Sequence, residues 1–181
     1  MIGWLIWKSP GKTSPILAST GLSKAGSIAR LEALTINSTT QWLLMRGVDS
    51  TKPILLFLHG GPGLPETSLL TDHELEKKFI VVKWEQRGAG KSYSADVFDR
   101  SFTVLTFVND AVAVSQWLTR RFRQPKIYLM AHSWGTFLGV LIVQKRPDLF
   151  KAYFSISQIS RLLRSRAGAP QTPVYLSKFG P

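Results

Sequence analysis

Four short stretches of the chain are largely apolar, and each leads into a turn rich in glycine or polar residues. Apolar runs of this length without regular polar alternation are typical of strands that a parallel sheet covers on both faces. We therefore predict four parallel-type strands, at residues 53–58, 79–84, 126–130 and 151–156.

Longer segments between these strands have the pattern of helices. In residues 104–122 apolar side chains recur every three or four positions, which predicts an amphipathic helix. Residues 134–146 are mostly apolar and are followed by Pro147, which is typical of a buried helix that ends there. A shorter helix is expected at 71–77, where the sequence has the spacing of a capping box.

Two further strands are predicted near the start of the folded region, at residues 30–37 and 41–47, with residues 38–40 as the turn of a hairpin. Strands and helices then alternate along the chain. This order predicts a mainly parallel α/β sheet with an antiparallel hairpin at its N-terminal side. Functional residues in such sheets lie at the carboxyl ends of the strands.

The chain divides into three parts by composition. Residues 1–29 are expected to be a linker or the remnant of an N-terminal anchor, 30–160 a folded domain, and 161–181 an irregular basic tail. The apolar start, residues 1–7, is far shorter than the ~20 residues that cross a bilayer. The location is therefore left open between cytoplasmic and membrane-anchored through a segment upstream.

The net charge of +12 raises the question of nucleic-acid binding. Nine of the excess positive charges lie in the two end segments, 1–30 and 151–181, neither of which contains an acidic residue. A nucleic-acid-binding domain carries its charge as a stripe on a folded face. We therefore expect no nucleic-acid partner.

The turn after the third parallel strand has the pattern of a nucleophile elbow. Ala131, His132, Ser133, Trp134 and Gly135 follow a strand and precede an apolar helix, as in the pattern G-x-S-x-G. Alanine replaces the first glycine but keeps a small side chain. A serine at a helix start is more often only an N-cap. The strand before it and the helix after it favour Ser133 as a nucleophile.

The turn after the first parallel strand consists of His59, Gly60, Gly61, Pro62 and Gly63. It is either a simple glycine-rich loop or an oxyanion loop, in which a backbone N–H faces a developing alkoxide. The elbow further along the chain favours the oxyanion loop.

No motif indicates a nucleotide, a metal or another cofactor. The glycines at 88 and 90 do not fit a phosphate-binding loop, because Glu85 occupies the position of its first glycine. The chain has no cysteine, which excludes zinc–thiolate sites and thiol nucleophiles.

These motifs together resemble the α/β-hydrolase fold, and within it the prolyl iminopeptidase-like serine aminopeptidases. The similarity rests on HGGPG at 59–63, WEQRGAGKSYS at 84–94, YLMAHSWGT at 128–136 and PDLFKAYFSISQ at 147–158. The resemblance implies Ser133 as the nucleophile and the N–H groups of Gly61 and Trp134 as oxyanion donors. It also implies release of an N-terminal residue, often proline, from a short peptide.

The expected partners of the serine are not found in this sequence. α/β-Hydrolases supply Ser, then Asp or Glu, then His in chain order. After Ser133 the sequence has one acidic residue, Asp148, and no histidine. A helix rising ~1.5 Å per residue would put Asp148 roughly 20 Å from the serine. His132 should point elsewhere, His73 belongs to a helix start, and His59 belongs to the oxyanion loop.

We therefore expect an α/β-hydrolase fold that is truncated after the strand following the nucleophile helix. Three interpretations remain: part of a prolyl iminopeptidase-like hydrolase, part of an esterase-type α/β-hydrolase, or a non-catalytic binding module. The expected partner is a short peptide or a small amide or ester substrate.

Overall fold

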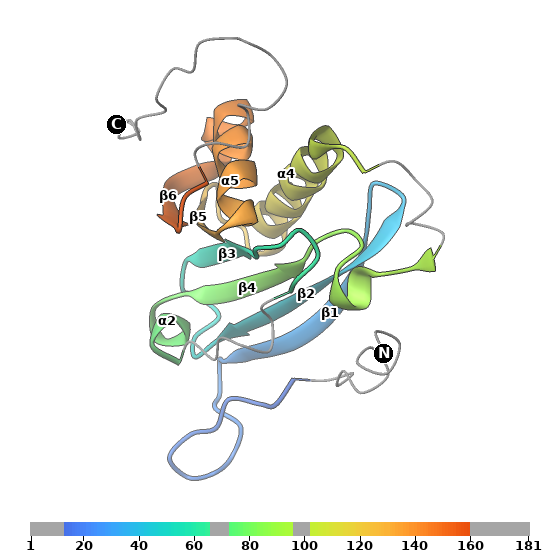
Figure 1. Ribbon diagram of the computed structural model, residues 1–181. Helices are drawn as coiled ribbons and strands as arrows, with labels where there is room; N and C mark the ends of the chain where they lie inside the picture. Colours follow the sequence, from blue (N-terminus) through green and yellow to red (C-terminus); the bar gives the residue numbers. More distant parts are fainter. Residues whose placement is uncertain (1–12, 66–72, 96–101, 160–181) are drawn as a thin grey trace, which may run out of the picture.

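The computed structural model describes residues 13–65, 73–95 and 102–159. Within them, six strands form one sheet in the order β1-β2-β4-β3-β5-β6 (Figure 1). β1 pairs antiparallel with β2 and β2 with β4, whereas β4, β3, β5 and β6 run parallel. The predicted parallel α/β sheet with an antiparallel hairpin is confirmed. The strands are β1 (Ile28–Ile36), β2 (Thr39–Gly47), β3 (Ile54–Leu58), β4 (Ile80–Glu85), β5 (Ile127–His132) and β6 (Phe150–Ile156).

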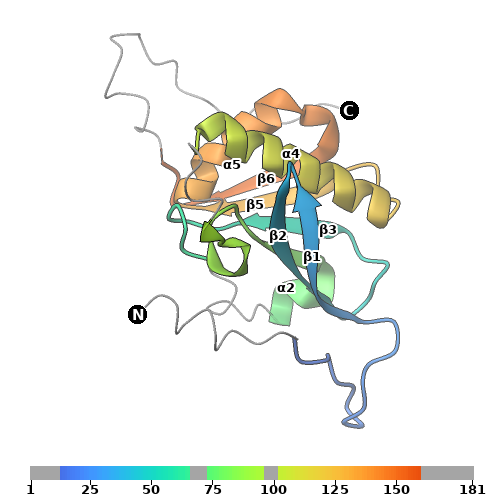
Figure 2. The ribbon, with the colours of Figure 1, turned by 90° about the vertical axis from the view of Figure 1, so that its right-hand side faces the viewer.

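Helices lie on both faces of the sheet. The longer helices α4 (Val104–Arg121) and α5 (Trp134–Lys145) cover one face, and the short helix α2 (His73–Lys78) lies on the other (Figure 2). Two 3₁₀ turns, η1 (Gly90–Ser92) and η2 (Pro147–Leu149), follow β4 and α5. None of the helices within the described ranges is long and apolar enough to span a bilayer.

The core forms between α4, α5 and the face of the sheet beneath them. β3 and β4 are buried along their whole lengths, as their continuous apolar sequences predict. In β5 every second residue faces the two helices and has no exposed surface. The fully buried apolar residues here include Leu56, Val82, Ala111, Val114, Leu118, Ile127, Leu129, Ala131, Leu138 and Ile142.

The hairpin turn differs from the prediction. It consists of Asn37 and Ser38, with φ angles of 45° and 64°, and Ile36 pairs with Thr39 across it. Two residues with positive φ form the turn that best matches the twist of a hairpin. Thr39 and Thr40 belong to β2, where the Thr39 hydroxyl donates to the Ile36 carbonyl at 2.9 Å.

The outer parallel strands, at 126–130 and 151–156, are not covered on both faces. Tyr128 and Met130 of β5 are half-buried, on the face away from α5. Phe154 pairs with Met130 and is 44% exposed, and Ile156 is 46% exposed. Among the described strands, β6 is paired on one side only. An edge strand flanked by exposed apolar side chains favours association between chains.

We therefore predict that a polypeptide of these 181 residues self-associates, and that Phe154→Lys raises the monomer fraction. The charge would disfavour contact between apolar edges. Sedimentation velocity of the parent and variant measures the difference. Leu22→Lys is the matched control, since Leu22 is 72% exposed but lies in the N-terminal loop. A monodisperse parent with a cooperative transition above ~45 °C, the low end for ordinary domains, would contradict the prediction.

Candidate active site

Ser133 lies between β5 and α5 in an uncommon backbone conformation, with φ 50° and ψ −118°. Residues other than glycine rarely adopt positive φ, and such strain persists only where neighbours hold it in place. The Ser133 N–H donates to the Ile156 carbonyl at 3.1 Å. The Ser133 carbonyl accepts from the Thr136 N–H at 2.9 Å and the Thr136 hydroxyl at 2.6 Å. The strained residue is thus tied to β6 and to the first turn of α5.

Gly135 brings this turn against the end of β3. A Cβ atom on Gly135 would lie 2.9 Å from the His59 carbonyl oxygen, and closer still to that of Leu58. The contact follows from strand pairing, because Leu58, the last residue of β3, lies opposite Ala131 in β5. The absence of a side chain at 135 therefore lets α5 begin directly against the neighbouring strand.

The turn after β3 also depends on glycine. Gly61 has φ 116°, and a Cβ atom there would lie 2.7 Å from the Gly63 nitrogen and 2.8 Å from the Leu64 nitrogen. The Gly61–Pro62 peptide is cis. This turn and the turn at Ser133 leave neighbouring parallel strands at the same edge of the sheet.

The structure thus places the two predicted sets of site residues at the carboxyl ends of the neighbouring strands β3 and β5. One set comprises His59, Gly60, Gly61, Pro62 and Gly63, and the other Ala131, His132, Ser133, Trp134 and Gly135. Their chemical roles remain predictions.

A buried ion pair beside these turns was not predicted from the sequence. Arg87 follows β4 and donates through Nε and Nη2 to the two carboxylate oxygens of Asp110 in α4, at 2.7 and 2.8 Å. The Asp110 side chain has no exposed surface and that of Arg87 is 7% exposed. The signal was present in the sequence: Asp110 is a carboxylate immediately before Ala111, on the apolar face of the predicted helix.

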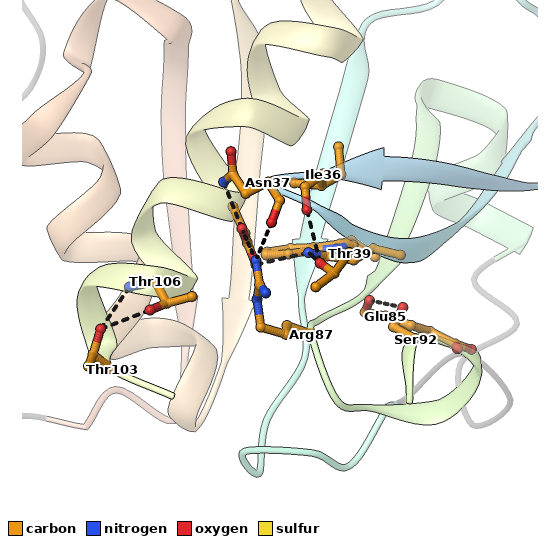
Figure 3. A network of polar contacts seen from close by, with 11 residues as sticks. Ile36, Asn37, Thr39, Glu85, Arg87, Ser92, Thr103 and Thr106 are labelled. Carbon is orange, nitrogen blue, oxygen red and sulfur yellow. Dashed lines mark hydrogen bonds and ion pairs between the residues drawn. The ribbon is translucent and has the colours of Figure 1, made fainter. Parts of the chain in front are cut away.

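The ion pair also joins the hairpin to the rest of the domain (Figure 3). Asp110 accepts from the Asn37 side chain at 2.7 Å and from Gln41 Nε2 at 2.8 Å. Gln41 in turn accepts from Trp84 Nε1 at 2.8 Å. One carboxylate therefore connects α4, the β1–β2 turn and the segment after β4.

Glu85 closes the turn after β4. Its carboxylate accepts from the Lys91 N–H at 2.5 Å, and its carbonyl accepts from the Ser92 hydroxyl at 2.6 Å. Ser92 also accepts from the Trp42 N–H at 2.9 Å. These contacts hold the segment after β4 to Glu85 and to β2.

Asp148 lies at the far end of α5 from Ser133, in η2, as expected. Its carboxylate accepts from Arg146 Nε and Nη2 at 2.8 and 2.6 Å. These hydrogen bonds and the arginine charge hold the pKa of Asp148 below its usual range. Asp148 is thus part of an exposed ion pair at the opposite edge of the sheet.

The elements that carry His73 and His132 indicate where these two histidines lie. His73 begins α2, which precedes β4 and so lies at the amino-terminal edge of the parallel strands. His132 lies on the same face of β5 as Met130, opposite the helices. The third histidine, His59, is buried at 1% exposure under the turn after β3.

Tyr153 of β6 packs against the first turns of α5. Its hydroxyl donates to the Thr136 carbonyl at 2.8 Å, and its ring lies where a Cβ on Gly139 would be. Burial raises the pKa of Tyr153 above its usual value. No cluster of three or more His, Asp or Glu side chains able to hold a metal ion occurs in the described part of the chain.

Comparison with known proteins identifies the class that this fold and site define. The family model for the alpha/beta hydrolase fold matches residues 53–174. The chain therefore belongs to the α/β-hydrolase fold family.

Within that family, the similar curated proteins are aminopeptidases and proline iminopeptidases. The chain is 47% identical over 135 residues to the probable aminopeptidase YbaC of Bacillus subtilis, covering 74% of the chain and 42% of that protein. It is 32% identical over 97 residues to a proline iminopeptidase of Lactobacillus helveticus, covering 52% of the chain and 32% of the relative. The chain thus spans less than half the length of these relatives.

Solved structures show the same fold. A proline iminopeptidase-related protein of Thermus thermophilus matches with a TM-score of 0.58 at 24% identity, over 71% of this chain and 44% of that one. An epoxide hydrolase of Vigna radiata matches with a TM-score of 0.56 at 26% identity, over 71% and 40%. The predicted resemblance to prolyl iminopeptidase-like hydrolases is confirmed.

The buried ion pair generates a stability prediction. Asp110→Ala leaves the buried Arg87 charge without its partner, and we expect the free energy of unfolding to fall by about 3–5 kcal/mol. Urea unfolding followed by circular dichroism measures the loss. Lys77→Ala is the matched control: the Lys77–Glu74 pair is exposed, and its removal should have no measurable effect.

The double variant Arg87→Met with Asp110→Leu tests how much of that loss of stability comes from the unpaired Arg87 charge. Replacing both charges by apolar groups of similar size should recover the part of the lost free energy that comes from the unpaired charge, but not the part that comes from the lost hydrogen bonds of Asn37 and Gln41. A single Asp110→Ala variant as stable as the parent would contradict the assigned role of the pair.

Proposed function

We propose that the chain carries the nucleophile and the oxyanion hole of a serine hydrolase, with Ser133 as the nucleophile. The observation that carries the proposal is the backbone of Ser133, held at positive φ between β5 and α5 with Gly135 against the carbonyls of Leu58 and His59. Strain of this kind concentrates at functional sites. A strand, a sharp turn bearing serine and a helix is also the context of the nucleophile elbow.

In this reaction the Ser133 hydroxyl attacks the carbonyl carbon of the substrate, and negative charge develops on the carbonyl oxygen. The N–H groups of Gly61 and Trp134 stabilise that oxygen. Trp134 is the first residue of α5, where backbone N–H groups lack a partner within the helix. The two donors therefore come from the two adjacent turns.

The relatives support the proposed substrate class. Their names describe aminopeptidases and proline iminopeptidases, which supports release of N-terminal residues, proline among them, from short peptides. The 181 residues themselves supply no histidine after Ser133 and only Asp148 as an acid, which is bound to Arg146. The general base and its acid partner are thus not provided by these residues.

A polypeptide of these 181 residues alone is accordingly expected to have negligible peptidase activity. Without a base the serine hydroxyl is a weak nucleophile, and the oxyanion hole and binding alone contribute roughly 10³- to 10⁴-fold over water. Hydrolysis of proline arylamide by the purified chain measures this. Turnover at ordinary enzyme rates that Ser133→Ala abolishes would contradict the expectation.

A chimaera tests the nucleophile directly. The 135 matching residues of this chain replace the corresponding part of the Bacillus subtilis relative, of which they cover 42%. The chimaera should hydrolyse the same aminoacyl arylamides as the parent relative, and Ser133→Ala should reduce the rate at least ~10³-fold. Ser50→Ala, at an exposed loop serine, is the control and should leave the rate unchanged.

Two outcomes would contradict the proposal. One is a chimaera that retains activity after Ser133→Ala. The other is a folded chimaera without activity on any arylamide that the parent relative hydrolyses.

A further inference from the structure

Both ring nitrogens of the buried His59 have hydrogen-bond partners. The backbone N–H of Gln86, in the segment after β4, lies 3.1 Å from Nε2. Nδ1 lies 2.7 Å from the carbonyl oxygen of Gly60. The ring therefore bridges the turn after β3 and the turn after β4.

These partners determine where the ring carries its proton. A backbone N–H can only donate, so Nε2 must accept and is unprotonated. A carbonyl can only accept, so Nδ1 must carry the proton and donate to Gly60. These two bonds fit a neutral imidazole protonated at Nδ1, in which the acceptor nitrogen Nε2 is engaged by the Gln86 N–H.

The Nδ1–H···O=C bond fixes the orientation of one peptide. The Gly60 carbonyl and the Gly61 N–H belong to the same trans peptide plane, in which they point in opposite directions. The carbonyl points toward the His59 ring, which is held from the β4 side of β3. Since β3 lies between β4 and β5, we expect the Gly61 N–H to point toward the β5 side, where Ser133 follows β5.

The Gln86 side chain also contacts the backbone of His59. Its Nε2 donates to the His59 carbonyl at 3.0 Å, and the residue is 1% exposed. Gln86 Oε1 is buried without a hydrogen-bond partner among the described residues. The hydrogen bond to the His59 carbonyl is therefore the polar contact that this side chain makes among the described residues. Gln86 is itself next to Arg87, which Asp110 anchors.

We propose that His59, held by Gln86, is a positioning residue that keeps the Gly60–Gly61 peptide oriented with the Gly61 N–H toward the oxyanion of the substrate. The proposal rests on the function proposed above. If this bond is lost, the peptide can rotate and present the Gly60 carbonyl to the same region. A carbonyl there would repel the oxyanion that an N–H stabilises.

The first test measures the ring and the peptide in the 181-residue chain itself. With ¹⁵N-labelled histidine, the His59 resonances should be those of a neutral ring protonated at Nδ1, and should be absent in His59→Phe. Residual dipolar couplings report the direction of the Gly61 N–H bond, which should change in His59→Phe. A ring protonated at Nε2, or an unchanged N–H direction, would overturn the proposal without any reference to catalysis.

The second test measures kinetics in the chimaera described above. His59→Phe should lower kcat by about 10²- to 10³-fold, the effect of losing one oxyanion donor, with KM within about twofold. Gln86→Met removes only the side-chain donor and should lower kcat less. Leu118→Ala, a buried residue of α4, is the control: it lowers stability but should leave kcat unchanged.

The two proposals fail separately. Activity that depends on Ser133 but is unaffected by His59→Phe would overturn the role of His59 and leave the nucleophile in place. Activity independent of Ser133 would overturn the proposed function, while the dipolar couplings would still decide whether His59 orients the peptide.

Discussion

The direct contact of Gly135 with the backbone of β3 is the constraint on which the arrangement of the site depends. No side chain separates the start of α5 from the carbonyls of Leu58 and His59. Because β3 and β5 are paired neighbours, this contact fixes the turn bearing Ser133 against the turn of glycines 60, 61 and 63. Ser133 is then held at positive φ by the hydrogen bonds from Thr136 and to Ile156.

A second set of contacts supports the same turns from the β4 side. The Arg87–Asp110 pair ties the segment after β4 to α4, and Gln86 ties it to His59. Rigid elements with buried hydrogen bonds hold functional groups more accurately than loops alone. In this molecule the ion pair, the glutamine and the histidine connect one rigid helix to the peptide of Gly61. An ion pair that appears purely structural thus also supports the proposed oxyanion loop.

The amino-acid sequence predicts local features of this domain well and long-range features poorly. The uniformly apolar strands β3 and β4 and the turns after β3 and β5 follow from short segments, because their patterns are local. The hairpin turn lies at Asn37 and Ser38 rather than at 38–40, because the β-branched Thr39 and Thr40 complete β2. The Arg87–Asp110 pair joins residues 23 positions apart, and only the fold brings them together. The Nε2 contact of His59 likewise depends on Gln86, from the segment after β4.

The outer strands illustrate a different limit. Residues 126–130 and 151–156 have the composition of strands buried on both faces, yet Phe154 and Ile156 are exposed in the described part of the chain. The sequence shows which residues of a strand are apolar, whereas their burial depends on what packs against them. The same distinction applies to the site: residues can be assigned to turns from sequence, but their partners cannot.

The central claim is that Ser133 and Gly61 act on one substrate atom, and the distance between the Ser133 Oγ and the Gly61 nitrogen tests it most directly. A crystal structure of the chain measures that distance. Oxyanion donors lie ~3 Å from the oxygen that they stabilise, so the two atoms should be close enough to contact a common carbonyl group. A separation of more than about 8 Å would contradict the account, because a nucleophile and a donor so far apart cannot act on the same carbonyl.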